Sequence, residues 1–199
     1  MVSHFFAYLS KLRWIIRWGL KRNLTSENVM EHSWEVATIA HALALLRRRR
    51  DPSIDPNAVA TAALYHDCSE VITGDLPSPI KYHSKAIQQA YHSIERDAQL
   101  ELLGLLPEEL RADYEAVMLE ERIPSAWREL IKAADTISAY LKCQSELAAG
   151  NREFETAAED IRRRLDCYEL PEVAYFMRTF VPSYSLTLDQ LLVRQSDQN

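Results

Sequence analysis

Glycine and cysteine are both scarce in this sequence. Four glycines among 199 residues argue against a β-rich fold with many tight turns, so the composition predicts a mostly helical chain. The three cysteines, Cys68, Cys143 and Cys167, are widely spaced and form no CxxC pair, which argues against a disulfide framework or a thiolate zinc site. We therefore expect a reducing compartment, the cytoplasm, and we expect each cysteine to be a small buried apolar residue.

Long apolar runs are also missing. No stretch approaches the roughly 20 residues that span a bilayer, so no membrane association is expected. The basic, apolar segment 3–22 is interrupted by Lys11, Arg13 and Arg17, unlike the apolar region of a signal peptide. A transit peptide or a surface-binding helix is the alternative, but helical spacing favours a core-facing helix. Its apolar positions are Phe5, Leu9, Leu12, Ile16 and Leu20.

An excess of positive charge is absent as well. The formal net charge of -6 gives no reason to expect binding to a nucleic acid polymer. Four consecutive arginines at residues 47–50 fall where a helix should end, and they suit the negative end of its dipole as a solvated terminus. An anionic substrate would need a local cluster of positive charge, which the N-terminal segment provides.

Apolar residues recur with the period of a helix through most of the chain. Capping residues, prolines and glycines divide this pattern into helices, and the proline-containing segment 75–79 should be an extended loop. With 47% hydrophobic residues and no linker or repeat, residues 1–199 should form a single all-α domain with a substantial core. The expected helices cover residues 29–46, 57–72, 84–106, a segment opening at 107, 126–149 and, as a pair, 151–180, before a tail at about 190–199 that should fray.

Ionisable residues are concentrated at the end of one expected helix. His66, Asp67 and Glu70 share one side of its final turns, and burying such groups is costly unless a partner neutralises them. His32 lies on the core-facing side of another helix, and Asp135 lies beside the apolar face of a third. If the three helices converge, two imidazoles and two carboxylates form a site suited to a divalent transition metal. Surface positions or ordinary hydrogen-bonded positions are expected for the histidines that lack such neighbours, His41, His83 and His92.

Four short motifs occur in an order that resembles a known family. They are EHSW at residues 31–34, YHDCSE at 65–70, GDLPSPIK at 74–81 and KAAD at 132–135. This order is similar to that of HD-domain metal-dependent phosphohydrolases, and most similar to their bacterial branch of YfbR-like 5'-deoxynucleotidases. The resemblance extends over nearly the whole chain and implies an HD-type helical bundle with a metal site between helices.

The resemblance also implies roles for particular residues. It implies that one divalent ion such as cobalt or manganese is bound by four ligands, and that the substrate is a deoxynucleoside 5'-monophosphate. In the family, an Arg-Trp pair meets the phosphate and sugar, and a loop after the second motif contacts the nucleotide. The implied ligands are His32, His66, Asp67 and Asp135, and the implied substrate contacts are Arg17, Trp18, Asp67, Asp75, Leu76, Pro77, Ser78 and Asp135.

Two positions depart from the family pattern. Ser78 stands where the family has threonine, so the hydroxyl is kept while a methyl contact is lost, which bears on base or sugar preference. Gly19 follows Trp18 where the family has proline, which bears on the rigidity of the turn beside the substrate.

These expectations lead to a hydrolytic mechanism. A divalent metal lowers the pKa of water and provides a nucleophile, so a covalent step at Cys68, among acidic neighbours, is not needed. Arg17 would offset phosphate charge by a two-point contact, and either Glu70 or Asp75 would donate a proton to the leaving 5'-oxygen. The alternative role of Glu70 is to orient a histidine ligand, and that of Asp75 is to bond its own turn.

Deoxynucleoside and phosphate are the expected products, and the family resemblance implies a homodimer. One alternative is an HD phosphohydrolase of a cyclic or pyrophosphorylated nucleotide. Another is a non-catalytic protein whose helices are held together by the metal and which only senses a nucleotide.

Overall fold

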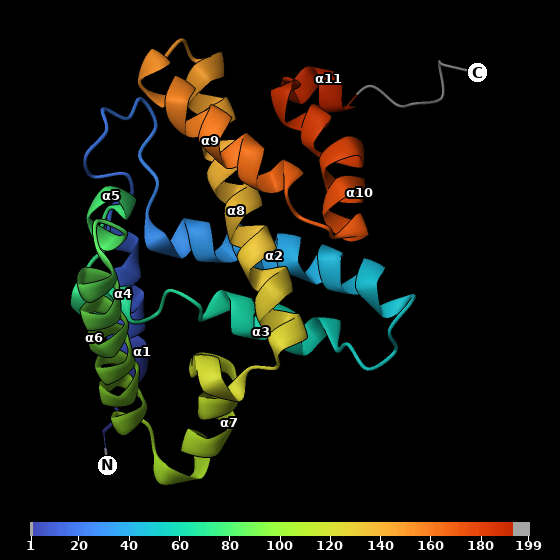
Figure 1. Cartoon of the computed structure of the whole chain (residues 1–199). Helices are drawn as coiled ribbons and strands as arrows, with labels where there is room; N and C mark the ends of the chain where they lie inside the picture. The colour runs from blue at the N-terminus through green and yellow to red at the C-terminus, as the bar shows by residue number, and fades with distance from the viewer. Residues whose placement is uncertain (1, 193–199) are drawn as a thin grey trace.

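The computed structural model describes residues 2–192, and this part of the chain is all-α, as the composition predicts (Figure 1). It contains no β-strand, only one isolated antiparallel bridge between Ile16 and Asn28. The elements are α1 (Phe5–Leu9), η1 (Ser10–Trp14), α2 (Val29–Arg48), α3 (Pro56–Leu64), α4 (Glu70–Thr73), α5 (Ser78–Lys81), α6 (Lys85–Gly104), α7 (Glu108–Met118), η2 (Glu120–Arg122), α8 (Ser125–Ala148), η3 (Arg152–Phe154), α9 (Glu155–Asp166), α10 (Pro171–Thr179), η4 (Val181–Ser185) and α11 (Leu188–Leu192).

The long helices begin and end where local signals predict. Asn28 caps α2 by accepting from the backbone N–H of Glu31, whose side chain accepts in turn from the Asn28 N–H, which forms a capping box. Asp55 caps α3 ahead of Pro56, and Gly74, with φ of 71°, follows α4 in a conformation that glycine adopts readily. These short-range interactions confirm most of the expected boundaries.

The main core lies where α8 crosses α2, with α3 against both (Figure 1). Its fully buried side chains include Val36 and Leu43 from α2 and Leu130 and Ile137 from α8. These residues repeat at the spacing of one helix face, which is why burial of that face stabilises the crossing.

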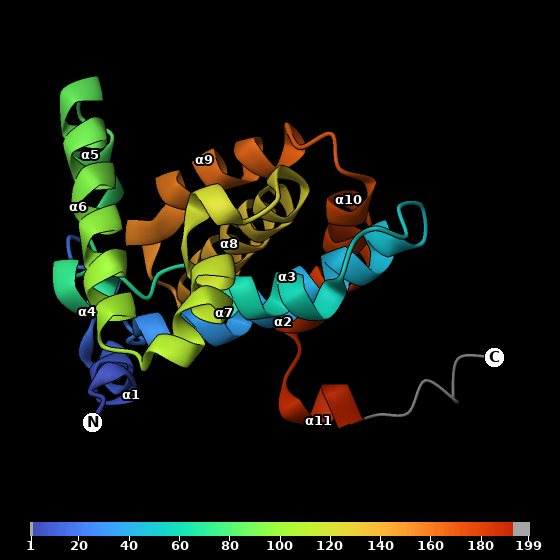
Figure 2. The ribbon, with the colours of Figure 1, turned by 90° about the horizontal axis from the view of Figure 1, so that it is seen from below.

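A second cluster of buried residues lies between α1, α6 and α7 (Figure 2). Phe5 is its N-terminal member and is fully buried, and the partly buried Val117 of α7 packs against both clusters. The remaining buried members are Cys68, Leu102, Leu103, Leu106, Met118 and Leu119.

The expected continuous helix over residues 57–72 is wrong in one important respect. The helix ends at Leu64, and a series of tight turns runs through residues 65–69 before α4 begins. Within this turn the N–H of His66 bonds to the carbonyl of Ala63, and that of Cys68 bonds to Tyr65. The bonds reach three residues back, as in a 3-10 helix, so His66 and Asp67 project from a bend.

The N-terminal segment is also only partly as predicted. Phe5 and Leu12 are buried, but Ile16 and Leu20 are exposed, because the helical conformation ends at Trp14 and the chain is extended where it pairs with Asn28. The loop expected at residues 75–79 is shorter than predicted, since α5 begins at Ser78.

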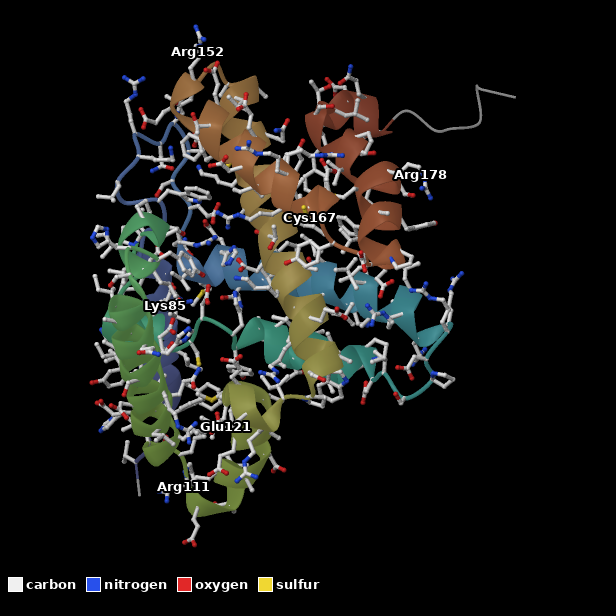
Figure 3. The ribbon with its side chains drawn as sticks, viewed as in Figure 1. Lys85, Arg111, Glu121, Arg152, Cys167 and Arg178 are labelled. Carbon is white, nitrogen blue, oxygen red and sulfur yellow. The ribbon has the colours of Figure 1, made fainter. Side chains whose placement is uncertain are left out.

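Some predictions about individual side chains are corrected as well. Cys68 and Cys143 are buried, whereas Cys167 is exposed at the end of α9 (Figure 3). The arginine run is not simply solvated, because Arg47 and Arg50 pair with the buried Glu172 of α10.

The tail expected to fray from about 190 is helical through Leu192, and its remainder lies outside the described residues. Between residues 2 and 192 no helix is both long and apolar enough to cross a membrane.

Candidate functional site

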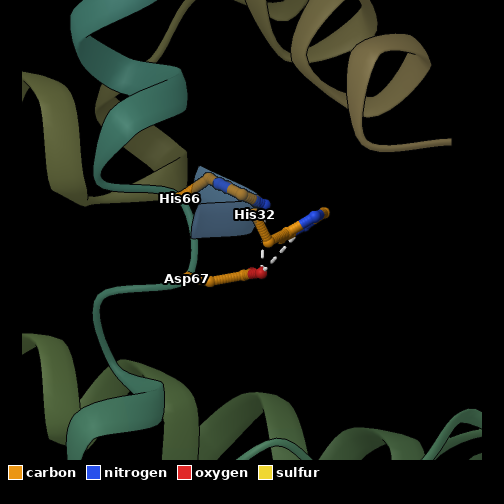
Figure 4. Close-up of side chains that lie close together, drawn as sticks. All are labelled: His32, His66 and Asp67. Carbon is orange, nitrogen blue, oxygen red and sulfur yellow. Dashed lines mark ion pairs between the residues drawn. The ribbon is translucent and has the colours of Figure 1, made fainter. Parts of the chain in front are cut away.

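Three separate parts of the fold bring the predicted metal ligands together. His32 comes from the first turn of α2, His66 and Asp67 from the bend after α3, and Asp135 from the middle of α8. One ligand atom each from His32, His66 and Asp67 lies within 4.8 Å of the other two (Figure 4). Asp135 adjoins this group, because its Oδ1 is 3.3 Å from His32 Nε2.

Both histidine rings present the same atom to the carboxylates. His32 Nε2 is 3.5 Å from Asp67 Oδ2, and His66 Nε2 is 3.1 Å from the same oxygen. Both Nε2 atoms are buried, and neither has a hydrogen-bond partner. Because buried polar atoms nearly always have a partner, this arrangement fits a cation that both rings would bind.

The opposite ring nitrogens explain why Nε2 is free to bind a cation. His66 Nδ1 is 2.7 Å from the carbonyl oxygen of Ala63, which can only accept, so Nδ1 carries the proton and Nε2 carries the lone pair. His32 Nδ1 is 3.1 Å from Ser138 Oγ, which itself donates to Glu35 Oε2 at 2.6 Å. Ser138 therefore accepts from His32 Nδ1–H. Hydrogen bonds of this kind orient histidines that bind metals.

Glu35 and Ser138 were not predicted from the sequence. Glu35 lies three residues after His32, and Ser138 lies three residues after Asp135, a spacing that places each residue near its ligand on the same helix. Burial raises the pKa of Glu35, against the hydrogen bond from Ser138, which lowers it. The spacing within each helix could have indicated both residues from the sequence. Their contact with each other depends on the crossing of α2 and α8.

The carboxylates of the site favour a positive charge at its centre. Burial acts to raise the pKa of Asp67, but His66 and His32 lower it well below its usual range. Burial likewise opposes the lowered pKa of Asp135, which His32 and the neighbouring Lys132 stabilise. Burial would lower the pKa of His66, yet Asp67 raises it. The site therefore attracts a cation, either a proton or a metal ion.

Arg17 lies on the loop between η1 and α2, on the same side of the fold. Its Nη1 donates to Glu27 Oε1 at 2.5 Å, and its Nε is buried without a partner. Burial acts against the raised pKa of Arg17, which the charges of Glu27, Asp67, Asp135 and Asp75 support. Glu27 thus holds this guanidinium, and the same Oε1 atom lies 3.8 Å from His32 Nδ1.

Trp18 follows Arg17 in an uncommon backbone conformation, with φ of 62°. A non-glycine residue in this region needs support from its surroundings. The indole ring packs against the buried Phe154, with ring centroids 5.3 Å apart, and its Nε1 is buried without a hydrogen-bond partner.

The two candidate proton donors have different surroundings. Burial, followed by the charges of Asp67 and Asp75, raises the pKa of Glu70 to about 10, and its Oε2 is buried without a partner. Burial also raises the pKa of Asp75, although Arg17 acts in the opposite direction. Burial therefore favours the protonated form of both carboxyl groups, and the pKa of Glu70 lies well above neutral pH.

The remaining predicted residues lie beside this group. Leu76 and Pro77 are half-buried and Ser78 is exposed, and among the described residues none of their side chains hydrogen-bonds to the metal-ligand candidates. Burial raises the pKa of the Cys68 thiol to about 12, which disfavours the thiolate that a covalent mechanism would require.

Two cavities border the metal-ligand candidates. The larger, about 1120 Å³, reaches His32 but none of the other three ligands. The smaller, about 780 Å³, is lined by three of the four ligand candidates, His66, Asp67 and Asp135. The predicted substrate contacts Arg17, Trp18 and Asp75 line neither cavity. Four basic side chains also line the smaller cavity, and each is paired with an acidic residue of the same lining. The pairs are Lys81–Glu95, Arg96–Glu121, Arg128–Glu120 and Lys132–Asp135.

Known 5'-deoxynucleotidases resemble this chain over nearly its whole length. The sequence model of the YfbR-like 5'-deoxynucleotidase family matches residues 4–184. A 5'-deoxynucleotidase of Yersinia pestis (strain Pestoides F) is 47% identical over 197 residues, covering 98% of this chain and 100% of the relative. A 5'-deoxynucleotidase of Yersinia pseudotuberculosis serotype O:1b has the same identity and coverage.

Solved structures share the fold at lower sequence identity. An HD-domain phosphohydrolase from Listeria innocua superposes with a TM-score of 0.79 at 22% identity, covering 91% of this chain and 88% of that chain. An HD phosphohydrolase of cyanophage S-2L, bound to dA and one catalytic Zn²⁺ ion, gives a TM-score of 0.60 at 22% identity, covering 89% and 96%. These likenesses confirm the HD-type helical fold.

Proposed function

Because this chain belongs to the YfbR-like 5'-deoxynucleotidase family and is a 5'-deoxynucleotidase, we propose that it hydrolyses 2'-deoxyribonucleoside 5'-monophosphates with one bound divalent transition-metal ion. The ligands are His32, His66, Asp67 and Asp135, and the ion is cobalt, manganese or a similar metal such as zinc. The observation that carries this proposal is the pair of buried, unpartnered Nε2 atoms that face Asp67.

The protein supplies the orientation and the charges around the phosphate. A divalent ion in this site would contribute Lewis-acid chemistry and lower the pKa of water. Arg17 offers a planar guanidinium whose Nε has no partner, so it can bind two phosphate oxygens when the Glu27 contact rearranges. Asp75, Leu76, Pro77 and Ser78 form the neighbouring edge that contacts the nucleotide.

Glu70 is the proton donor to the leaving 5'-oxygen. Its raised pKa of about 10 keeps it protonated at neutral pH, and its buried, unpartnered Oε2 leaves an oxygen available to the substrate. Asp75 is the alternative donor in its protonated form, in which it would no longer supply the negative charge that raises the pKa of Arg17.

Trp18 forms a wall against the deoxyribose. The ring cannot move freely, because it is packed on the buried Phe154. A rigid apolar wall excludes an added 2'-hydroxyl, typically by about a hundredfold.

A substrate panel tests the proposed activity. With cobalt(II) or manganese(II) added, phosphate release from dAMP and dCMP should exceed release from AMP by about a hundredfold in kcat/KM. Equal rates on dAMP and AMP would contradict the sugar selectivity. Faster turnover of a cyclic or pyrophosphorylated nucleotide would contradict the substrate class, and metal-dependent folding without any turnover would indicate a nucleotide sensor.

The Arg17→Lys variant tests the phosphate contact. Lysine keeps the charge but presents a single point in place of a planar fork, so kcat/KM for dAMP should fall about 10- to 100-fold, the equivalent of one lost charged hydrogen bond. The measurement is steady-state phosphate release. Arg13→Lys, in the exposed part of η1, is the matched control and should leave kcat/KM unchanged. Equal rates for both variants would exclude a two-point contact by Arg17.

The proposal also covers the organisation of the chain. Residues 1–199 form one domain, which the packing of Val117 against both buried clusters supports. All three cysteines are free thiols, as suits the cytoplasm.

Two copies form a homodimer, for which exposed apolar side chains such as Trp34, 66% exposed, are available. A sedimentation velocity experiment that finds only monomer would exclude the dimer.

A further inference from the structure

A cluster of buried polar residues lies at the end of α8, away from the metal ligands. Glu146 is 1% exposed, Asn151 is 3% exposed and Lys142 is 8% exposed. Lys142 donates to Glu146 Oε1, and Asn151 Nδ2 donates to Glu146 Oε2 at 2.7 Å. A buried charge pair of this kind is weak evidence for stability by itself, so its presence calls for another explanation.

The remaining hydrogen-bond donors and acceptors of this cluster bond to the loop that carries Arg17 and Trp18. The two carboxylate oxygens of Glu146 accept from the backbone N–H groups of Leu24 and Thr25, each at 3.0 Å. Lys142 donates to the Thr25 carbonyl, and Asn151 donates to the Arg22 carbonyl at 2.7 Å. In Figure 1 the loop rises beside the end of α8 and the start of α9.

The same cluster reaches the ring of Trp18 by a second route. Phe154, which follows Asn151 in η3, is fully buried and packs against the Trp18 ring. Lys142 Nζ lies 5.5 Å from the centre of the Phe154 ring, and Lys21 donates to the Glu153 carbonyl at 2.8 Å. Residues 21–25 of the loop and the indole ring of Trp18 are therefore held by one set of neighbours.

The two ends of the loop are joined to each other by a separate contact. Ile16 and Asn28 form the isolated bridge, in which the Arg17 N–H bonds to the Glu27 carbonyl at 2.9 Å. The loop is thus fixed at its base by the bridge and at residues 22–25 by the Glu146 cluster. Trp18 lies between these two attachments, with a positive φ that needs support from its surroundings.

We infer that Glu146, with Lys142 and Asn151, is a positioning residue that holds Trp18 against the deoxyribose and thereby determines the discrimination against ribonucleotides. The inference rests on the proposed function. Glu146 touches neither substrate nor metal ligand, and it acts through backbone atoms of residues 22–25 and through the Phe154 surface.

The test is the ratio of kcat/KM for dAMP to kcat/KM for AMP. Glu146→Gln replaces one acceptor oxygen by an amide and removes the charge, so the ratio should fall about tenfold from a wild-type value of about a hundred. Metal affinity, measured by calorimetric titration with Mn²⁺, should stay within a factor of two of wild type, because the ligands are untouched.

Glu172→Gln is a matched control. Glu172 is another buried glutamate, 2% exposed, that pairs with Arg47 and Arg50. Arg47 lies at the opposite end of α2 from His32, about 22 Å along the helix. The Glu172→Gln variant should lower the melting temperature much as Glu146→Gln does. It should leave the ratio of kcat/KM for dAMP to kcat/KM for AMP unchanged. A fall of the ratio in both variants would assign the effect to general destabilisation and overturn the inference.

A second variant keeps the test decisive if Glu146→Gln fails to fold. In the double variant K142M/E146L no charge is left unpaired, yet the Leu24 and Thr25 N–H groups lose their acceptor. It should fold and show the same loss of sugar discrimination, and an unchanged ratio would overturn the inference. If wild type itself does not prefer dAMP, the proposed function fails instead.

Discussion

Asp67→Asn should reduce phosphate release from dAMP by more than about 100-fold, which is the upper range for residues that only support a metal ligand. Asp67 Oδ2 lies within 3.5 Å of the free Nε2 atoms of both His32 and His66, so the substitution removes the charge that faces both rings. Neutral asparagine binds divalent ions weakly, and activity should disappear together with metal binding. Cobalt(II) titration followed by visible absorption measures the second effect.

A matched control separates this effect from general loss of charge. Asp97→Asn changes an exposed residue of α6 and should leave both turnover and cobalt binding unchanged. If Asp67→Asn bound cobalt as tightly as wild type and still turned over dAMP, Asp67 would not be a ligand. The shared-cation site would then have to be abandoned.

Glu70→Gln should lower kcat for dAMP about 10²- to 10⁴-fold, the usual contribution of a general acid. Glutamine preserves the size of the side chain but has no proton to give to the leaving oxygen. KM should change little, because the phosphate contact of Arg17 and the wall formed by Trp18 remain. Initial rates at several dAMP concentrations separate kcat from KM.

The same substitution should stabilise the protein when metal is removed. Burial raises the pKa of Glu70 to about 10 from its ordinary 4.5, so above pH 4.5 the folded state holds a proton that the unfolded state has released. This linkage contributes stability below pH 4.5 that is lost as the pH rises toward 10. Glutamine does not titrate, so the melting temperature of the variant in EDTA should exceed that of wild type increasingly from pH 6 to pH 9.

Glu101→Gln, at an exposed position of α6, provides the control for both measurements. It should alter neither kcat nor the dependence of melting temperature on pH. An unchanged kcat for Glu70→Gln, together with a large fall for Asp75→Asn, would transfer the proton-donor role to Asp75. A melting temperature that fell with the Glu70 substitution would show instead that the carboxyl makes a stabilising contact.

Local chemistry in the sequence determined the helical fold and most helix boundaries. The capping box of Asn28 and Glu31 and the stop at Gly74 depend on interactions between residues a few positions apart, and such interactions can be recognised without knowledge of the fold. The types of residue that converge at the candidate site could also be predicted, because a histidine beside an aspartate in an apolar segment is costly without a partner.

Tertiary structure alone decided how these residues meet. The bend at residues 65–69 replaces a predicted helix, and the change of direction there places His66 and Asp67 opposite His32. The Glu35–Ser138 hydrogen bond and the attachment of Leu24 and Thr25 to Glu146 join residues more than 100 positions apart. Such contacts depend on the crossing of whole helices, which results from the packing of many apolar side chains and leaves no short pattern in the sequence.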